Sequence, residues 1–363
     1  MIFNNLDEYL NEGINKLVKE AIKKAVKNPK ETAFLVQYGL SAKKAEKKRL
    51  TAKEQGEHIP SFLIASITEQ CNLNCTGCYS RAKKESNRTG EMNREDWKRI
   101  FTEAEEMGIS AILLAGGEPF LRSDIIDEAA LHPSILFPVF TNGTMMDSTR
   151  LDIFDKYRHM IPIISIEGDE KLTDERRGEG IHAGILTVMD KLNETGLLFG
   201  VSITVTNNNI DAVTGEKTIS DMEKKGCKIV IYVEYVPVTG PEIAPDEAGR
   251  QLLEEKIASL REKREMIFIS FPGDEKESGG CLAAGRGFFH INAKGDAEPC
   301  PFSPYSDTSL KNKSLREALN SPLFAKLRTG GNLQMEHRGG CVLFDQADYV
   351  SNLVKLNKGE LQI

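Results

Sequence analysis

The sequence predicts an α/β protein built around a parallel sheet. Short apolar segments alternate with helical patterns from residue 61 to residue 240. Each expected strand is joined to the next by a helix, and parallel neighbours need crossover connections of this kind. The composition, 40% hydrophobic and 28% charged over 363 residues, is that of a globular protein with a sizeable core. The sheet is either open and doubly wound or curved into a partial barrel, and in both cases the reactive groups lie at the carboxyl ends of the strands.

The individual elements follow from local patterns of apolar residues. Strands are expected at residues 62–68, 110–115, 136–141, 161–167, 199–206 and 228–236. Helices are expected between them at residues 94–107, 124–131, 148–157, 182–194 and 218–225.

Residues 1–60 are expected to form a helical extension in front of this unit. Residues 6–27 have apolar positions at helical spacing with lysines between them, and Asn28-Pro29 is expected to end that helix. A second basic helix is expected at residues 41–54. A lysine-rich amphipathic helix can lie on an anionic membrane surface. We favour the alternative, a helical cap that packs on the main domain, because such helices are common and unspecific.

The pattern changes after residue 240. Residues 241–266 are expected to be a linker with a charged helix, and residues 267–363 a small α+β module rich in glycine and containing cysteines. Lys294-Gly295 lies between two short segments that are expected to form a hairpin. Helices are expected at residues 314–328 and 345–355.

Composition excludes several classes of protein. No apolar run approaches the roughly 18–20 residues that span a bilayer, and the N-terminus does not resemble a signal peptide. The net charge of −7 argues against a nucleic-acid-binding protein. The seven cysteines are too few and too unevenly placed for a disulfide framework in a chain of this length. They predict thiolate metal ligands in a reducing compartment, which is the cytoplasm.

Cys71, Cys75 and Cys78 fall in one loop directly after the first expected strand. Thiolates select iron–sulfur clusters, zinc or copper(I). A structural zinc needs four ligands, and no histidine or fourth cysteine lies nearby in the sequence. Three thiolates on a four-iron cluster leave one iron open, and an open iron is a reaction site. The alternative is three incidental or redox-active cysteines.

The spacing C-x3-C-x2-C followed by Tyr79 resembles the signature of the radical S-adenosylmethionine (SAM) superfamily. This resemblance implies a partial (β/α)6 TIM-like barrel and a 4Fe–4S cluster whose open iron is chelated by SAM. It also implies reductive cleavage of SAM to a 5′-deoxyadenosyl radical that abstracts a substrate hydrogen, with ferredoxin or flavodoxin as the reductant. The protein supplies ligation, orientation and seclusion.

Two further turns resemble the SAM-binding motifs of that family. Gly116-Gly117-Glu118 follows the second expected strand and resembles the GGEP motif, which implies that Glu118 receives the SAM amino group. Thr141-Asn142 follows the third strand and resembles the turn near the SAM ribose.

The later strands carry weaker resemblances. Ser165 and Glu167 match the S-x-D-G motif with Glu in place of Asp, and Arg177 is the implied partner of the SAM carboxylate, which suits the guanidinium fork. Thr204 and Tyr235 are candidates for the wall of the SAM site, and each is equally well explained as a packed sheet residue.

Cys281, Cys300 and Cys341 resemble a shortened SPASM or twitch module. That resemblance implies one auxiliary 4Fe–4S cluster with three cysteine ligands. The fourth ligand is left open between Cys227, His337, a carboxylate and a bound substrate. Three buried thiols without a cluster are the alternative. Cys227 opens the sixth expected strand and is expected to pack in the core.

The sequence therefore predicts a radical SAM oxidoreductase or maturase that modifies a peptide or protein, with no catalytic residue of the chain assigned. The first alternative is the same chemistry on a small molecule such as a nucleotide, sugar, tetrapyrrole or lipid precursor. The second is a non-catalytic iron–sulfur protein for electron transfer or sensing. Glu118 and Arg177 favour an enzyme, because a passive cluster needs no partner for the SAM amino and carboxylate groups.

Overall fold

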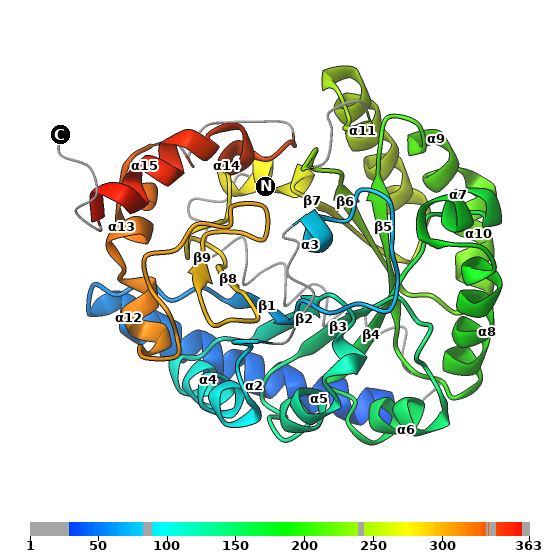
Figure 1. Cartoon of the computed structure of the whole chain (residues 1–363). Coiled ribbons are helices and arrows are strands. Elements are labelled where there is room, and N and C mark those ends of the chain that lie inside the picture. The colour runs from blue at the N-terminus through cyan, green and yellow to red at the C-terminus, as the bar shows by residue number, and fades with distance from the viewer. Residues whose placement is uncertain (1–28, 83–88, 239–242, 332, 334–338, 358–363) are drawn as a thin grey trace.

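A curved sheet of nine strands runs through the whole molecule, in the order β7-β6-β5-β4-β3-β2-β1-β8-β9. The computed structural model describes residues 29–82, 89–238, 243–331, 333 and 339–357. Figure 1 shows the sheet curled into an incomplete barrel with helices on its outer side. The strands are β1 (Phe62–Thr68), β2 (Ala111–Gly116), β3 (Phe137–Thr141), β4 (Met160–Ser165), β5 (Gly200–Val205), β6 (Ile229–Glu234), β7 (Ile267–Phe271), β8 (His290–Ile291) and β9 (Ala297–Glu298).

Strands β1 to β7 are parallel, and each pairs with the next along the chain. All six strands expected from the sequence are confirmed, with ends that differ by at most two residues. The expected partial barrel is also confirmed. Strand β7 is a difference, because the sequence assigned its residues to the C-terminal module. With the preceding helix α11 it forms one more helix–strand unit of the barrel. The sequence did not predict this strand, because only five residues separate a charged helix from a Pro-Gly turn.

Helices connect the parallel strands and cover the outer face of the sheet (Figure 1). They are α4 (Arg94–Met107), α5 (Ser123–Ala129), α6 (Ser148–Lys156), α7 (Glu170–Arg177), α8 (Ile181–Glu194), α9 (Ile210–Val213), α10 (Glu216–Lys224) and α11 (Glu247–Lys263), with a 3-10 turn at Pro119–Leu121. The short helix α3 (Tyr79–Ala82) instead lies inside the ring of outer helices in Figure 1. The local sequence of α4 determines where this helix begins and ends. Asn93 and Asp96 form a capping box at its start, and Gly108 ends it in the left-handed conformation.

The N-terminal extension differs from the expectation. The helix expected at residues 6–27 lies outside the described residues. The expected end of that helix at Asn28-Pro29 stays a prediction. Helix α2 (Pro29–Glu54) is longer than the predicted segment 41–54. None of the helices in the described part of the chain is both long and apolar enough to cross a membrane.

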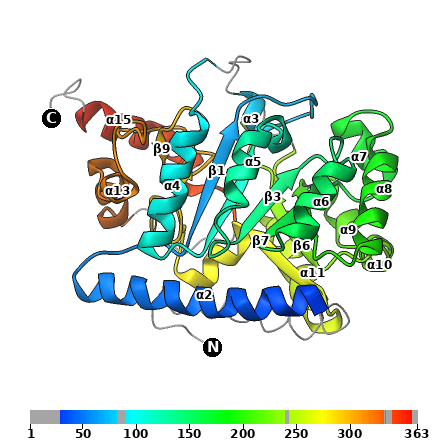
Figure 2. The same cartoon turned by 90° about the horizontal axis from the view of Figure 1, so that it is seen from below.

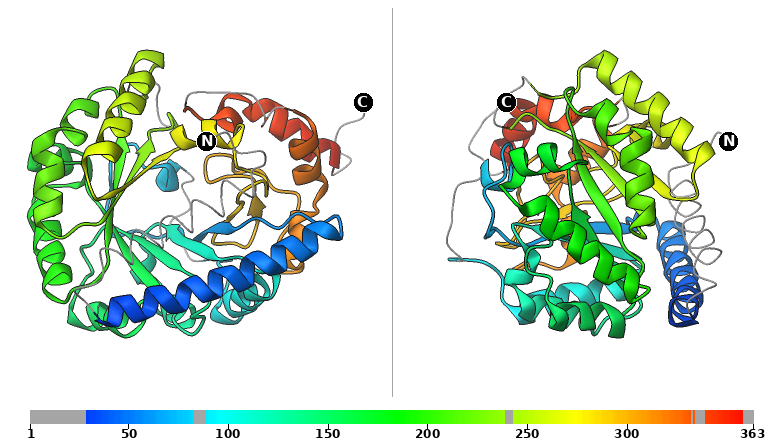
Figure 3. Two further views of the ribbon diagram at one scale, coloured as in Figure 1. Left: turned by 180° about the vertical axis from the view of Figure 1, so that it is seen from behind. Right: turned by 90° about the vertical axis from the view of Figure 1, so that its right-hand side faces the viewer.

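Helix α2 crosses the outside of the barrel at the amino ends of the strands, as Figures 2 and 3 show. The phenol of Tyr38 donates to the carbonyl oxygen of Ser110, just before β2, at 3.1 Å. Glu31 accepts from Arg158, just before β4, at 2.7 Å. The helix therefore covers the end of the barrel opposite to the carboxyl ends of the strands.

The C-terminal part joins the sheet through β8, which pairs in parallel with β1, and the expected hairpin is confirmed as β8 and β9. The other elements are the 3-10 helix η2 (Gly273–Ser278), α12 (Leu315–Leu319), α13 (Pro322–Thr329), α14 (Val342–Asp345) and α15 (Ala347–Asn357). The single helix expected at residues 314–328 is wrong. Ser321 caps a new helix with Pro322 at its first position, and proline cannot continue the preceding one. Apolar residues from both parts belong to one continuous core.

Candidate active site

Three half-buried thiols lie in the loop between β1 and α3, at the carboxyl edge of the sheet. They belong to Cys71, Cys75 and Cys78. The backbone N–H of Thr76 donates to the carbonyl oxygen of Arg176 at 2.8 Å, which ties the middle of the loop to the end of α7. Burial raises the pKa of Cys71 and Cys75. For Cys75, the nearby Arg177 opposes this increase, so the guanidinium favours the thiolate.

The Gly116-Gly117 turn after β2 packs directly on the cysteine loop. A Cβ atom at Gly117 would lie 1.9 Å from the carbonyl oxygen of Gln70, and one at Gly116 would lie 2.3 Å from that of Thr68. The N–H groups of Gly117 and Glu118 donate to these same two oxygens at 2.8 Å. Only glycine fits at this distance, so the turn forms a cradle that fixes the start of the cysteine loop.

Glu118 is fully buried, and its carboxylate holds the turn after β3. It accepts from the Thr141 hydroxyl at 2.8 Å, from the Asn142 N–H at 2.8 Å and from the Phe120 N–H at 3.2 Å. Burial raises the pKa of Glu118, and these hydrogen bonds oppose that increase. A carboxylate has about four acceptor positions. Three protein donors use three of these positions, so the carboxylate can accept one more hydrogen bond, as from an ammonium group.

Asn142 links the turn after β3 to the cysteine loop. Its side-chain amide donates to the side-chain oxygen of Asn72 at 2.9 Å, and its nitrogen lies 3.9 Å from the sulfur of Cys71. Thr141 and Asn142, which the sequence singled out, are thus brought to the same place as Cys71.

The carboxylate of Glu167 contacts two of the other predicted site residues, Arg177 and Thr204. One carboxylate oxygen accepts from Nη2 of Arg177 at 2.6 Å and lies 3.0 Å from Nε of Arg176, and the other accepts from the N–H of Thr204 at 2.9 Å. Nη1 of Arg177 lies 4.0 Å from the sulfur of Cys75. Nε of Arg177 is buried and has no hydrogen-bond partner within the described residues. The guanidinium of Arg177 is therefore held beside the cysteine loop, and its Nε donor has no hydrogen-bond partner among the described residues.

Tyr235 packs against the cysteine loop, and Tyr79 directly follows it. A Cβ atom at Gly77 would meet the ring of Tyr235 at 2.6 Å, so this ring packs against the loop backbone. Tyr79 stacks edge-on against Phe302 of the C-terminal part at a centroid distance of 5.2 Å, and its phenol hydrogen-bonds to Ser66. Ser165 ends β4 at the same edge of the sheet and pairs with β5, and it is half-buried.

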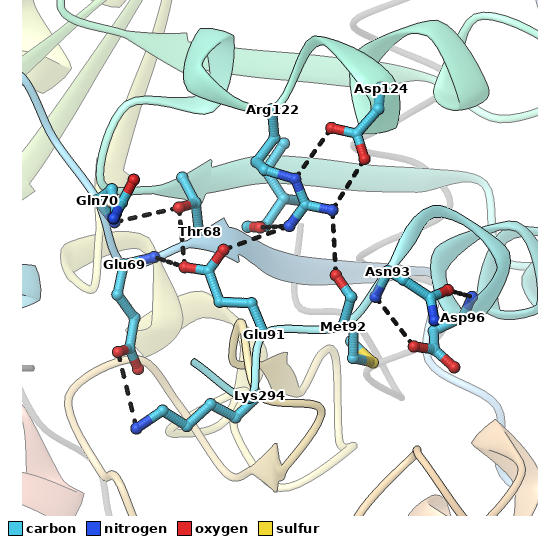
Figure 4. A network of polar contacts seen from close by, with 12 residues as sticks. Thr68, Glu69, Gln70, Glu91, Met92, Asn93, Asp96, Arg122, Asp124 and Lys294 are labelled. Atoms are coloured by element: carbon cyan, nitrogen blue, oxygen red, sulfur yellow. Dashed lines mark hydrogen bonds and ion pairs between the residues drawn. The ribbon is translucent and has the colours of Figure 1, made fainter. Parts of the chain in front are cut away.

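Glu91 and Arg122 support the site, and neither belongs to a motif that could be recognised in the sequence. Figure 4 shows the carboxylate of Glu91 accepting from the hydroxyl of Thr68 at 2.9 Å and from the N–H of Glu69 at 2.8 Å, where the cysteine loop begins. Arg122 lies 3.3 Å from the same carboxylate and is held by Asp124 through two hydrogen bonds of 2.9 Å. Both side chains are buried, so they hold the first residues of the cysteine loop from inside the protein.

The other three cysteines that the sequence singled out also come together. Cys300 hydrogen-bonds to Cys341, and Cys281 is close enough to Cys341 for their charges to interact. Among the described residues, no three side chains converge closely enough to hold a single metal ion. In a cluster each thiolate binds its own iron, so cluster ligands stand farther apart than ligands of one ion.

Two of the possible fourth ligands are not part of this group. Cys227 is fully buried before β6, and its thiol donates to the carbonyl oxygen of Ile229 at 3.2 Å, at the opposite end of the barrel. Burial raises its pKa to about 12, as expected for a thiol in the core. His337 lies outside the described residues.

Glu234, at the carboxyl end of β6, was not singled out from the sequence. Its carboxylate accepts from the N–H of Gly340 at 2.8 Å and lies 3.6 Å from Arg250. A Cβ atom at Gly339 would be 2.1 Å from one of its oxygens. Glu234 therefore fixes the turn that leads into Cys341.

Comparison with known proteins agrees with this geometry. Residues 65–219 match the family model of the radical SAM superfamily. The chain is 26% identical over 306 residues to the AdoMet-dependent heme synthase of Methanosarcina barkeri, covering 75% of this chain and 85% of that protein. It is 26% identical over 285 residues to the PqqA peptide cyclase of Bradyrhizobium diazoefficiens, covering 75% of this chain and 73% of the relative.

The fold is shared with Streptococcus suis SuiB bound to S-adenosylmethionine. The TM-score is 0.66 at 19% identity, and the alignment covers 82% of this chain and 77% of SuiB. The family match spans β1 to α10, which includes the cysteine loop, the glycine cradle and the Glu167–Arg177 pair. Residues 65–219, which match this family model, therefore form a radical SAM domain, and the chain is an enzyme whose cofactors are S-adenosylmethionine and a 4Fe–4S cluster.

Proposed function

We propose that Cys71, Cys75 and Cys78 hold the SAM cluster and that the enzyme abstracts a hydrogen atom from a side chain of a peptide. The observation that carries the cluster assignment is the meeting of three thiols, a glycine cradle and a guanidinium at one edge of the sheet. When bound, the cluster and SAM supply a 5′-deoxyadenosyl radical after one-electron reduction. We propose ferredoxin or flavodoxin as the source of that electron and the cytoplasm as the location.

The chain's own residues bind and orient SAM. Glu118 has one acceptor position left beside the turn after β3, which suits the ammonium group of the methionine part. Arg177 has an Nε donor without a hydrogen-bond partner among the described residues, and its Nη1 lies 4.0 Å from the sulfur of Cys75, so its guanidinium suits the carboxylate. Glu167 keeps Arg177 in place through its 2.6 Å ion pair.

We also propose that Cys281, Cys300 and Cys341 hold one auxiliary 4Fe–4S cluster in a shortened SPASM or twitch module. The contacts among these thiols support the assignment, since the three residues come from segments 19 and 41 positions apart in the sequence. In the full-length triple variant Cys71→Ala/Cys75→Ala/Cys78→Ala, about four irons should remain. Near-zero residual iron would reject the auxiliary site.

The peptide substrate is supported by the similarity to the PqqA peptide cyclase. The similarity to the heme synthase favours a second candidate, radical chemistry on an iron porphyrin. The two candidates share the cluster and SAM but differ in the donor of the hydrogen atom.

Transfer of deuterium separates the two candidates. The reconstituted enzyme is incubated without oxygen with SAM, a strong reductant and either a short peptide encoded beside this chain's gene or an iron porphyrin, each deuterated in its side chains. Deuterium in 5′-deoxyadenosine from the peptide alone supports the proposal, and deuterium from the porphyrin alone supports the second candidate. No 5′-deoxyadenosine under any condition, with both clusters intact, would contradict the cluster assignment.

A further inference from the structure

The short segment just before α4 lies between the cysteine loop and the C-terminal part. The side chain of Glu91 is 2% exposed, and its Oε1 accepts from the hydroxyl of Thr68 at 2.9 Å and from the N–H of Glu69 at 2.8 Å (Figure 4). The N–H of the next residue, Met92, donates to the carbonyl oxygen of Ala293 at 2.8 Å, in the turn between β8 and β9. One segment therefore contacts both the start of the cysteine loop and the C-terminal hairpin.

The turn of the hairpin packs closely on this segment and on the cysteine loop. Gly295 has a φ of +92°, and a Cβ atom there would lie 2.9 Å from the sulfur of Met92, so any larger residue would displace that side chain. Nζ of Lys294 lies 3.9 Å from a carboxylate oxygen of Glu69, as Figure 4 shows. The hairpin is therefore held against the same residues that Glu91 holds.

Thr68 connects Glu91 to the glycine cradle. At Thr68 the pairing of β1 with β2 is irregular, as in a β-bulge, and bulges redirect side chains beside active sites. The hydroxyl of Thr68 donates to Glu91 and accepts from the N–H of Gln70 at 3.1 Å. Its carbonyl oxygen accepts from the N–H of Gly117, the residue before Glu118. A shift of Thr68 would therefore change the distance between the cysteine loop and Glu118.

Arg122 keeps the carboxylate of Glu91 in this position. Its Nη1 lies 3.3 Å from Oε2 of Glu91, and its Nη2 donates to the carbonyl oxygen of Met92 at 3.1 Å. Asp124 accepts two further hydrogen bonds of 2.9 Å from the same guanidinium. Because the guanidinium compensates the charge of the carboxylate, Glu91 acts through its position.

We propose that Glu91 is a positioning residue for the cleavage of SAM and that it links the cysteine loop to the C-terminal hairpin. SAM has to reach the cluster and Glu118 at the same time, so a shift of the cysteine loop relative to Glu118 weakens the binding of SAM. Residues that hold metal ligands in place typically contribute about 10–100-fold to affinity or activity. This inference rests on the proposed function of Cys71, Cys75 and Cys78.

The test measures the formation of 5′-deoxyadenosine from SAM by the full-length, reconstituted protein with a strong reductant and no substrate. Glu91→Ala removes the acceptor, Glu91→Gln keeps an amide oxygen in the place of Oε1, and Thr68→Val removes the hydroxyl. The matched control is Glu95→Ala, because the side chain of Glu95 is 79% exposed in the first turn of α4. The rate at saturating SAM and the KM for SAM are determined for each protein, since a loss of folded enzyme lowers the rate but leaves KM unchanged.

We expect the KM for SAM to rise about tenfold in Glu91→Ala and in Thr68→Val, and to stay within about threefold of the unchanged protein in Glu91→Gln. The Thr68→Val/Glu91→Ala protein should have the KM of Glu91→Ala, because both changes break the same hydrogen bond. Glu95→Ala should match the unchanged protein.

An unchanged KM in Glu91→Ala, whatever its rate, would overturn the inference. If Glu91→Ala does not fold, an unchanged KM in Thr68→Val overturns it instead. If the unchanged protein itself forms no 5′-deoxyadenosine, the proposed function fails, and this inference fails with it.

The link to the hairpin is tested with Gly295→Ala, whose added methyl group has to displace the side chain of Met92. Gly56→Ala is the control, because Gly56 also has a positive φ, +82°, but a Cβ atom there would meet nothing within 4 Å. We expect Gly295→Ala to raise the KM for SAM about threefold, with a smaller effect in the presence of Glu91→Ala, since both changes act on one segment. Gly56→Ala should leave KM unchanged. An unchanged KM in Gly295→Ala, or independent effects of Gly295→Ala and Glu91→Ala, would show that Glu91 does not link the hairpin to the cysteine loop.

Discussion

At the scale of single residues, the contact between Gly117 and the cysteine loop makes the sharpest prediction. A methyl group at residue 117 would lie 1.9 Å from the carbonyl oxygen of Gln70 and 3.0 Å from the N–H nitrogen of Cys71. Both are backbone atoms, so the loop itself has to move. We expect Gly117→Ala to lose most of the iron of the SAM cluster, measured as iron per protein after reconstitution.

Gly184 provides the matched control for that change. It lies within α8, and a Cβ atom there would meet nothing within 4 Å. Gly184→Ala should keep the iron of the unchanged protein and raise its stability by about 0.5–1 kcal/mol, because alanine is the better helix former. A Gly117→Ala protein with full iron content would show that the cradle does not fix the loop.

Glu167 makes a second prediction at this scale. Its side chain is 2% exposed and neutralises the guanidinium groups of Arg176 and Arg177. Glu167→Gln removes the charge but keeps the size, so two half-buried cations lose their counter-ion. We expect the free energy of unfolding to fall by about 3–5 kcal/mol, measured by urea denaturation of the apo-protein.

The control is Glu170→Gln, at the exposed start of α7. It should change the free energy of unfolding by no more than about 0.5 kcal/mol. Equal effects of the two variants would mean that Glu167 is not the counter-ion of this site.

The sequence allowed the site residues that belong to motifs to be predicted, but not the residues that hold those motifs in position. The cysteine spacing and the Gly-Gly-Glu turn are local, so they can be read directly. Glu91 and Arg122 could not be found, because each is an ordinary charged residue in the sequence. The contact of Glu91 with the N–H of Glu69, and that of Arg122 with Glu91, exist only after β1 and β2 have paired. The pairing of Glu167 with Arg177, ten positions apart, was likewise invisible although both residues were singled out.

At the scale of elements, α12 carries a capping box whose strength depends on pH. The hydroxyl of Ser314 accepts from the N–H of Glu317, and the carboxylate of Glu317 accepts from the N–H of Ser314. We expect Ser314→Ala to lower the free energy of unfolding by about 1 kcal/mol at pH 7. Thermal unfolding of the apo-protein measures it.

Hydrogen bonds from Lys313 and from Ser314 lower the pKa of Glu317 from 4.5 to about 2. A carboxyl group with a lower pKa in the folded state stabilises the protein above the unfolded-state value, and this contribution is lost as the pH falls from about 4.5 towards 2. Glu317→Gln should remove that part of the acid-induced loss of stability. An unchanged pH profile between pH 5 and pH 2 would show that the cap is not formed.

The predictions for helices and strands succeeded in some places and failed in others. Strands β1 to β6 could be predicted, because each is an apolar run between two helices. Helix α2 is longer than the predicted segment 41–54, because its first turns have too few apolar residues at helical spacing to be recognised in the sequence. The break between α12 and α13 was missed at Pro322, because proline ends a helix in its interior but is favourable at the first position of the next one. Strand β7 was assigned to the wrong part of the chain because a short apolar run does not show which strand it will pair with.

At the scale of the whole molecule, the barrel and the C-terminal part share one sheet. The pairing of β8 with β1 joins them, and the rings of Phe62 and Phe288 stack across the junction at 5.2 Å. The sequence predicted a separate module here, because a parallel pairing between segments more than 220 residues apart leaves no local signal. The two cysteine segments also meet directly, because the ring of Tyr79, the residue after Cys78, packs against Phe302, the second residue after Cys300, at 5.2 Å.

A buried chain of side chains crosses that junction and makes the last prediction. The hydroxyl of Ser66 in β1 is 2.7 Å from Nε2 of His290 in β8, and Nδ1 of His290 is 2.7 Å from Glu298 in β9. A double-mutant cycle of Ser66→Ala and His290→Gln measures how strongly this contact couples the two parts. We expect a coupling energy of about 0.5–3 kcal/mol in the free energy of unfolding, because both side chains are buried and in direct contact.

The control cycle pairs His290→Gln with Ser202→Ala in β5, a strand that does not pair with β8. The effects of these two changes should be additive within about 0.5 kcal/mol. Additive effects in both cycles would mean that backbone pairing and apolar packing alone attach the C-terminal part, and that the chain from Ser66 to Glu298 does not stabilise the placement of one cysteine group against the other.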